Sequence, residues 1–365
     1  MKTAGRHRGC WHEALAFVKR WVIRIGAVLA AAFLGLTLLN AGWLAPEPKG
    51  SVKLIAHRGI YQLYDRTALG RDTCSADRIE QPVHDYLENT VPSIARAAKL
   101  GAHLVEIDIA RTRDERLAVF HDWTVDCRTD GTGETRGFAL PELKALDAGH
   151  GYTADGGKTF PFRGKGTGVI PSVEEAMAAS GRAALLYNFK SKDAVEAELL
   201  AGAIREAGRD TGPRGDAFYG AKAPIERIRQ LLPDAWAFTR EEAEECSRDY
   251  VMMGWTGYVP QSCRDRTIIV PLDYQWAFWG WPNRMIARME EHGTRTVIVG
   301  PQGGGRPLGL DLPEQLGEIP DSFNGYAFVD DSLAVIPALI QRFDDRTQSE
   351  IDAVVDGLER RRASR

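Results

Sequence analysis

Short apolar runs alternate with helix-like segments along residues 52–343, and this alternation limits the folds open to the chain. Repeated strand–helix units pair their strands in parallel, and this many units favours closure into a barrel. We therefore predict an α/β fold with a (β/α)8 barrel over residues 52–345. The run 117–120 follows its predecessor too closely for a crossover helix, so it is a candidate to lie outside the parallel set. The predicted strands cover residues 52–56, 105–110, 117–120, 183–190, 217–220, 235–239, 267–272, 296–299 and 326–329.

The first fifty residues differ from the rest. A basic segment, residues 1–24, precedes residues 25–45, which contain no charged side chain and are long enough to cross a bilayer. By the positive-inside rule the basic end stays in the cytoplasm, and everything after the linker 46–51 is exported. We predict one transmembrane helix that anchors the domain at the cell membrane, on the extracytoplasmic (periplasmic or extracellular) side. A cleaved signal peptide is the alternative.

The cysteines agree with export. Four of the five follow the predicted anchor, an even number that suits an oxidising compartment. Proximity in sequence favours the pairs Cys74–Cys127 and Cys246–Cys263, although four cysteines allow three pairings. The first pair would hold the unassigned insertion 60–87 as a flap over a site. The tail 346–365 is predicted to be a small amphipathic helix with a frayed basic end.

Two carboxylates mark a candidate metal site. Glu106 and Asp108 alternate with apolar residues, so both lie on one face of the predicted strand. Neighbouring carboxylates raise each other's pKa unless a cation lies between them, which favours a hard divalent metal with oxygen ligands. A strand whose polar side faces water is the alternative. The net charge of −4 gives no reason to expect nucleic acid as a partner.

Further polar residues stand where predicted strands end. His57–Arg58–Gly59 and His121–Asp122 occupy such positions, where α/β folds keep their chemistry. Glu88 precedes the predicted helix 93–100 and serves either a site or the helix dipole. Glu175 has capping-box spacing from its N-cap, so we interpret it as structural. The aromatic cluster 274–281 fits neither helical nor strand periodicity, and core, substrate wall and membrane shelf are its three interpretations.

These motifs, taken in order, resemble those of the glycerophosphodiester phosphodiesterase family. The series comprises His57–Arg58–Gly59, Glu88–Asn89–Thr90, Glu106-x-Asp108, Phe120–His121–Asp122 and Ile170–Pro171, and the resemblance is best over about residues 52–190. It implies a TIM-type barrel that hydrolyses small-molecule or lipid phosphodiesters to an alcohol and glycerol 3-phosphate. It also implies that His57 and His121 serve as acid and base, while Glu106 and Asp108 bind Ca²⁺ or Mg²⁺. Arg58 would hold the phosphate with its planar fork.

One departure from the family pattern concerns the metal. The strand that normally reads Glu-x-Lys reads Asn188–Phe189–Lys190 here, so the catalytic Lys190 is kept while an amide replaces a third carboxylate ligand. An amide oxygen binds Ca²⁺ but brings no charge, so metal affinity should fall. Two alternatives remain open. Membrane tethering and the aromatic cluster favour a lysophospholipase D or a sphingomyelinase D-like cyclising enzyme, and the Asn188 exchange favours a non-catalytic tethered binding module.

Overall fold

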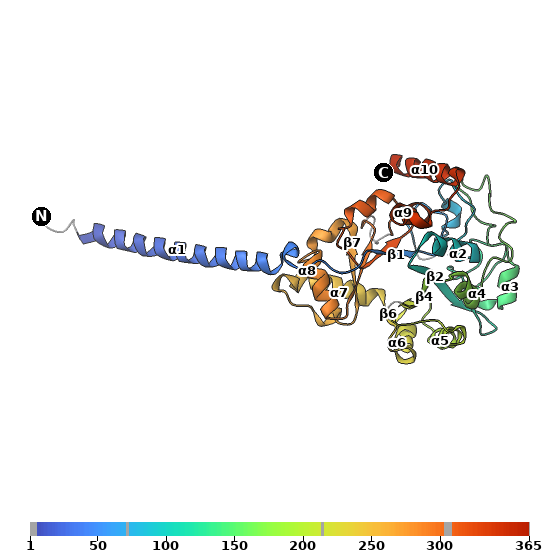
Figure 1. Ribbon diagram of the computed structural model, residues 1–365, viewed down its shortest axis with the longest axis horizontal. Coiled ribbons are helices and arrows are strands. Elements are labelled where there is room, and N and C mark those ends of the chain that lie inside the picture. Colours follow the sequence, from blue (N-terminus) through green and yellow to red (C-terminus); the bar gives the residue numbers. More distant parts are fainter. Residues whose placement is uncertain (1–5, 71–72, 213–214, 303–308, 365) are drawn as a thin grey trace.

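The computed structural model describes residues 6–70, 73–212, 215–302 and 309–364, with the backbone alone for residues 6–14. Eight parallel strands form a barrel in the order β6, β5, β4, β2, β1, β9, β8, β7, with helices around it (Figure 1). The predicted (β/α)8 barrel is therefore confirmed. The strands are β1 (Lys53–Ala56), β2 (Leu104–Arg111), β4 (Ala184–Phe189), β5 (Ala217–Gly220), β6 (Trp236–Phe238), β7 (Thr267–Pro271), β8 (Arg295–Val299) and β9 (Tyr326–Val329).

The barrel is not fully closed. Strands β6 and β7 end the pairing path, and in the described part of the chain no backbone ladder joins them. A side-chain contact links them instead, because Trp236 Nε1 donates to Thr267 Oγ1 at 2.9 Å. Strand β3 (Leu117–Val119) pairs antiparallel with β2, outside the parallel set, as its short connection predicts.

Helices follow most strands and begin at residues that suit helix starts. Thr90, Ser172 and Thr239 each accept a hydrogen bond from a backbone N–H in the first turn of the helix that follows. Glu175 completes the capping box with Ser172, as predicted. The helices around the barrel are α2 (Val91–Leu100), α3 (Leu140–Ala145), α4 (Val173–Ala179), α5 (Val195–Ala207), α6 (Lys222–Leu231), α7 (Arg240–Met253), α8 (Asn283–Glu291) and α9 (Ser332–Leu339).

Alternation along β2 divides its side chains between two environments. Val105, Ile107 and Ile109 belong to the apolar layer between the strands and the outer helices. Leu104 belongs to the cluster inside the barrel, and Glu106 and Asp108 share its face of the strand. The two carboxylates are therefore buried inside the barrel and do not face water.

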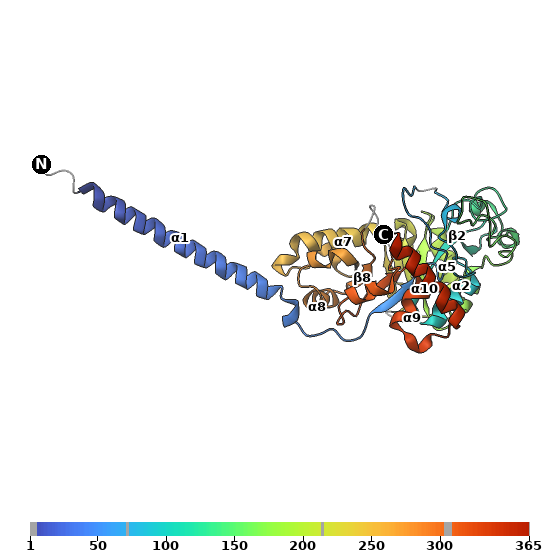
Figure 2. The ribbon, with the colours of Figure 1, turned by 90° about the horizontal axis from the view of Figure 1, so that it is seen from above.

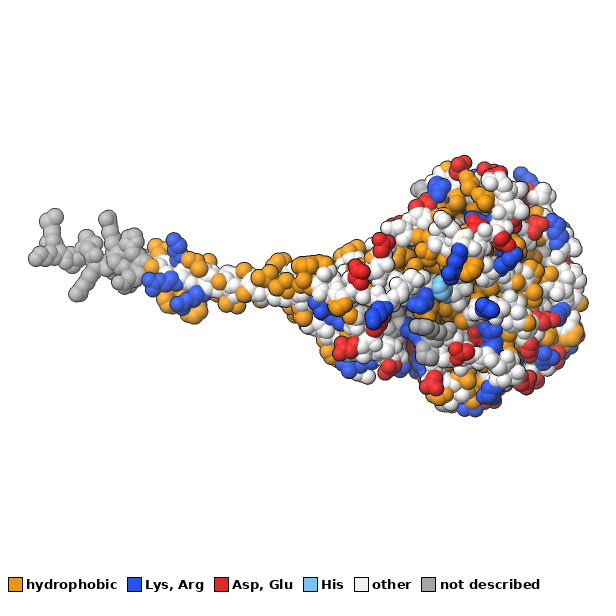
Figure 3. Space-filling view, viewed as in Figure 1, with side chains coloured by type: hydrophobic (Ala, Val, Ile, Leu, Met, Phe, Trp, Pro, Cys, Tyr) orange, Lys and Arg blue, Asp and Glu red, His pale blue; other side chains and the backbone are white. Residues whose placement is uncertain are grey.

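The N-terminal helix α1 (Arg6–Leu39) projects from the barrel in two perpendicular views (Figures 1 and 2). Residues Leu15–Leu39 are long and apolar enough to cross a membrane, and their side chains are mostly exposed. Basic side chains gather toward the outer end of this helix and hydrophobic ones nearer the barrel (Figure 3). The start of the basic segment, residues 1–5, lies outside the described residues.

The helix ends before the predicted limit at residue 45. Arg288 on α8 donates to the carbonyl of Leu39 at 3.0 Å, and Asn40 Nδ2 donates to the carbonyl of Trp255 at 2.7 Å. These contacts turn the chain onto the barrel, where Gly42–Leu44 form a short 3-10 helix. The last part of the uncharged stretch therefore packs against the domain.

Two disulfides confirm the predicted pairs. The S–S distance is 2.02 Å for Cys74–Cys127 and 2.06 Å for Cys246–Cys263. The first bond holds the insertion 60–87 in a small separate core with Tyr152 and Phe162. The insertion carries one 3-10 turn, Ala76–Arg78.

The predicted C-terminal helix is present as α10 (Gln348–Ala363). Its basic end is helical, so the prediction of a frayed end is wrong. Arg361 is buried because it reaches acidic partners on two other segments. Its Nη1 lies 3.0 Å from Asp331, and its Nη2 lies 3.1 Å from Glu80 in the insertion. The basic end of α10 therefore links the insertion to the barrel through ion pairs of Arg361.

Candidate active site

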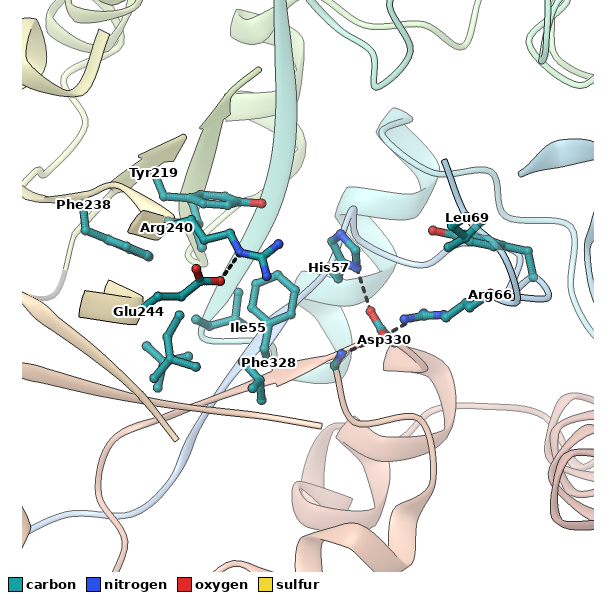
Figure 4. A pocket seen from close by; sticks show the side chains of 16 residues that line it. Ile55, His57, Arg66, Leu69, Tyr219, Phe238, Arg240, Glu244, Phe328 and Asp330 are labelled. Atoms are coloured by element: carbon teal, nitrogen blue, oxygen red, sulfur yellow. Dashed lines mark hydrogen bonds and ion pairs between the residues drawn. The ribbon is translucent and has the colours of Figure 1, made fainter. Parts of the chain in front are cut away.

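His57 stands at the end of β1 and is oriented by the end of β9. The pairing of Ala56 with Val329 brings Asp330 beside the ring, and the His57 Nδ1 to Asp330 Oδ1 distance is 2.7 Å (Figure 4). Asp330 Oδ2 lies 2.7 Å from Arg66 of the insertion. Burial disfavours the charged carboxylate, but Arg66 and His57 outweigh it and hold the pKa of Asp330 below its ordinary value. With Nδ1 occupied, proton exchange with a substrate falls to Nε2.

The turn after His57 depends on glycine. Gly59 has a φ of 76°, and a Cβ there would overlap the hydroxyl of Ser93. That hydroxyl accepts from the Ile60 N–H at 2.8 Å and donates to the Arg58 carbonyl at 3.0 Å. Arg58 itself has a φ of 53°, so this turn is held in an uncommon conformation at the site.

A chain of buried ion pairs connects Arg58 to His121. Arg58 Nη1 lies 2.9 Å from Glu88, and the other oxygen of Glu88 lies 3.0 Å from Arg128 Nη1. Arg128 Nε continues to Asp122 at 2.7 Å, and Asp122 binds His121 Nδ1 at 2.6 Å. Burial opposes the charge of Glu88, but Arg128 and Arg58 lower its pKa below the ordinary value. Both arginines remain charged, because the acids beside them raise their pKa values despite burial.

His121 also contacts Lys190 at the end of β4. The distance from His121 Nε2 to Lys190 Nζ is 2.7 Å. Burial lowers the pKa of both groups, and Arg58 lowers that of His121 further. A neutral imidazole that donates from Nδ1 to Asp122 and accepts at Nε2 from the ammonium group fits these contacts.

Glu106 lies close enough to His57, and Asp108 close enough to His121, for their charges to interact. Glu106 accepts from the Arg58 backbone N–H at 2.9 Å and from the Tyr219 hydroxyl at 2.5 Å. Asp108 accepts from the amide groups of Asn89 and Asn188 at 2.9 and 2.8 Å. Burial and the charge of Asp108 raise the pKa of Glu106, whereas His57 lowers it. Burial also opposes the charge of Asp108, but His121 and Arg58 lower its pKa below the ordinary value.

Sequence comparisons relate this chain to known proteins. The sequence model of the glycerophosphoryl diester phosphodiesterase family matches residues 75–254, about half of the chain. A glycerophosphodiester phosphodiesterase of Caldanaerobacter subterraneus is 38% identical over 108 residues, which are 30% of this chain and 41% of that relative. The matched region has the sequence of the glycerophosphodiester phosphodiesterase family. The chain aligns with less than half of that curated relative's length.

Solved structures share the fold of this chain. The phosphodiesterase domain of a Mycobacterium tuberculosis protein has a TM-score of 0.54 at 15% identity, covering 80% of this chain and 99% of the other. An Oleispira antarctica phosphodiesterase, solved with its product sn-glycerol-3-phosphate, has a TM-score of 0.50 at 16% identity. That match covers 81% of this chain and 98% of the other. At these identities the likeness shows the barrel fold.

A divalent cation suits part of the acidic site. The mutual repulsion that raises the pKa of Glu106 is what a bound cation relieves, and carboxylate oxygens are the ligands that Ca²⁺ and Mg²⁺ prefer. Asn188, the third predicted ligand, suits a cation less well. Its amide Nδ2 points to Asp108, so the amide must turn before it can offer an oxygen to the cation. Within the described ranges no group of three or more Asp, Glu, His or Cys side chains is arranged to hold a metal.

All eight residues predicted from the sequence gather at one end of the barrel. Arg58 is more confined than expected, because Glu88 holds Nη1 and Asp108 lies 3.4 Å from Nε. Its Nε is buried and makes no hydrogen bond within the described residues, although it is ion-paired with Asp108. The sequence-predicted residues are His57, Arg58, Glu88, Glu106, Asp108, His121, Asn188 and Lys190.

The site also contains residues that the sequence motifs did not predict. Asp330 follows the last strand, the position that singled out His57, so the same signal was available for it. Tyr219 alternates into the barrel from β5, and Arg128 follows a disulfide cysteine, where no local pattern marks its role. Asn89 directly precedes the N-cap residue Thr90, and its side chain binds Asp108.

A cavity of about 310 Å³ opens beside His57. His57, Arg66 and Asp330 line one side of it, and Tyr219, Arg240 and Glu244 line the other (Figure 4). The rest of the lining is apolar and includes Ile55, Leu186, Phe238, Val297, Val299 and Phe328. The cavity therefore combines paired charged side chains with an apolar wall, and of the eight residues predicted from the sequence it is lined by His57.

Proposed function

We propose that this protein is a glycerophosphodiester phosphodiesterase that releases an alcohol and glycerol 3-phosphate. The observation that supports this most is the pair of histidines close to Glu106 and Asp108, each held at Nδ1 by a carboxylate. Such a pair supplies a base and an acid to one phosphorus centre. The family match and the product seen in the Oleispira structure agree with the same reaction.

The proposed reaction uses the two histidines in turn. One takes the proton of an attacking hydroxyl, a new P–O bond forms, and the bond to the leaving alcohol breaks. The other histidine gives that alcohol its proton. Lys190 and Arg58 place positive charge beside the phosphate oxygens, where negative charge increases. A neighbouring hydroxyl of the substrate is the attacking group that the family resemblance implies, and water then opens the cyclic phosphate.

Glu106, Asp108 and Asn188 would hold the divalent cation, Ca²⁺ or Mg²⁺. When bound, the cation supplies charge neutralisation at the phosphate oxygens. The assay is release of glycerol 3-phosphate from a panel of diesters, with and without a chelator. Activity that survives complete chelation overturns the cation requirement, and no release from any diester overturns the proposed reaction.

Asn188→Glu tests the ligand set directly. The added carboxylate should tighten cation binding by roughly tenfold or more, because charge count is a main lever of Ca²⁺ affinity. Asn188→Gln introduces a side chain as long as that of Glu but without its charge, so it serves as the matched control. Calorimetric titration of both variants with Ca²⁺ measures the difference, and equal affinities would contradict the assignment.

We also propose that α1 anchors the domain on the extracytoplasmic side of the cell membrane. The apolar span Leu15–Leu39, its basic outer end and the two disulfides support this topology. Reporter fusions after Lys49 test it, and activity of a cytoplasm-only reporter would overturn it. The apolar wall of the cavity favours a second candidate activity, that of a lysophospholipase D acting on lipid diesters.

A further inference from the structure

A groove of about 790 Å³ runs along α7 and meets the cavity beside His57. The two spaces share three lining residues, Arg240, Glu244 and Ile269, so these side chains stand between them. They lie at the seam between β6 and β7, where the backbone ladder of the barrel is open. Arg240 and Glu244 pair with each other across one helical turn, and both are half exposed. These side chains therefore form the boundary between the cavity and the groove.

The far end of the groove lies beside the end of the anchor helix. Val251, Met252 and Tyr274 line that end. Val251 accepts a hydrogen bond from Trp279, whose carbonyl binds the Tyr250 hydroxyl, and that hydroxyl accepts from Arg288. Arg288 in turn binds the Leu39 carbonyl, the last residue of α1. Figures 1 and 2 both place α7 and α8 at the base of α1.

Exposed apolar side chains surround this end of the groove. Trp276 is 80% exposed and Met252 is 59% exposed, and Trp43, Trp255 and Tyr258 are also open to solvent. Tryptophan and tyrosine are the residues that favour the headgroup level of a bilayer. Of the three interpretations of the aromatic cluster, a membrane shelf fits Trp276, whereas Phe278 is buried core.

We propose that the groove and seam admit the acyl chain of a single-chain lipid phosphodiester drawn from the membrane that holds α1. The chain would lie along the apolar wall formed by Phe238, Ile269 and Val299, with its phosphate beside His57. The proposal rests on the phosphodiesterase function and on the anchor proposed above. The proposed occupant is a membrane lipid because the groove begins where the anchor helix ends.

The test blocks the groove at a residue that does not line the cavity beside His57. Arg248→Trp places a bulky ring in the groove, and Glu245→Trp makes the same change at a nearby exposed site of α7 away from the groove lining. The full chain is placed in phosphatidylcholine vesicles that carry lysophosphatidylcholine, and hydrolysis is compared with that of glycerophosphocholine in solution. We expect the ratio of lipid to soluble kcat/KM to fall at least about tenfold in Arg248→Trp, the loss of about 1.4 kcal/mol. Glu245→Trp should leave the ratio unchanged.

A second variant probes the other end of the same route. Met252→Asp puts a charge among the exposed apolar residues and should lower the lipid activity in the same way. Equal losses on both substrates, or no loss in either variant, would overturn the route. Cleavage of glycerophosphocholine without any cleavage of the lipid would overturn the route alone, whereas failure on both substrates in the unmodified chain would overturn the phosphodiesterase function.

Discussion

The two halves of the barrel mouth are built in opposite ways. On β1, β2 and β4, charged side chains are buried and bound to one another, from Asp108 through Arg58 to His121. On β6, β7 and β8, Phe238, Ile269 and Val299 present apolar surface around the cavity, and the strand ladder is open. We infer from this comparison that the first half holds the reacting groups in place, whereas the apolar lining of the second half can differ with the substrate.

The largest expected effect comes from cutting the charged half at Arg128. Arg128→Met leaves Glu88 and Asp122 buried without their shared partner and should lower the free energy of unfolding by about 3–5 kcal/mol. Arg113→Met removes a mostly exposed arginine from its pair with Glu142 and should have a much smaller effect. Urea denaturation of the full chain in detergent measures both. Equal effects would mean that the charged half is not an interlocked unit.

The next effect concerns the histidines themselves. His57→Ala and His121→Ala should each lower turnover by at least about a hundredfold, the scale of losing one positioned proton-transfer group. The pH profile should be bell-shaped, with limbs that belong to the pair. Turnover is measured per folded molecule, with folding checked by circular dichroism. Near-normal turnover with reduced stability would instead make His121 a brace for the strand ends.

The smallest expected effect concerns the insertion 60–87, which belongs to neither half of the barrel mouth. Burial lowers the pKa of His84 to about 4, and its Nδ1 accepts from the Tyr86 N–H at 3.1 Å. Because the folded-state pKa lies below the ordinary value, the unfolded chain binds more protons as the pH falls from about 6.5 toward 4. Stability should therefore be full above pH 6.5 and should decline below it.

His84→Asn removes this proton linkage. The variant should lose less stability than the unmodified chain between pH 7 and pH 4.5, as followed by urea denaturation at each pH. Parallel pH curves for the two proteins would show that His84 does not carry the effect.

Much of the fold was predictable because its strands repeat one local pattern. The alternation along β2 was enough to place Glu106 and Asp108 on one face of the strand, and the short connection was enough to place β3 outside the parallel set. The Cys74–Cys127 pairing also followed from sequence proximity. The helix at the C-terminus was predicted, but its ordered basic end was not, because the partners of Arg361, Glu80 and Asp331, are distant in sequence.

The candidate site was predictable only where a residue ends a strand beside a recognisable motif. His57 and His121 met that condition. Arg128 and Tyr219 did not, since each acts through a contact that only the folded chain creates. Arg58 was identified, but its confinement by Glu88 depends on the exact approach of two loops. The missing ladder between β6 and β7 likewise depends on how the whole sheet assembles, and no single segment of the sequence indicates it.

The contact of Arg288 with the end of α1 limits how the protein moves. Leu39 and Asn40 are both bound by the domain, so contacts as well as the chain itself join the helix to the barrel. If α1 spans a bilayer as proposed, these contacts would couple the orientation of the barrel to the tilt of the helix. The height of His57 above the lipid surface would then follow that tilt.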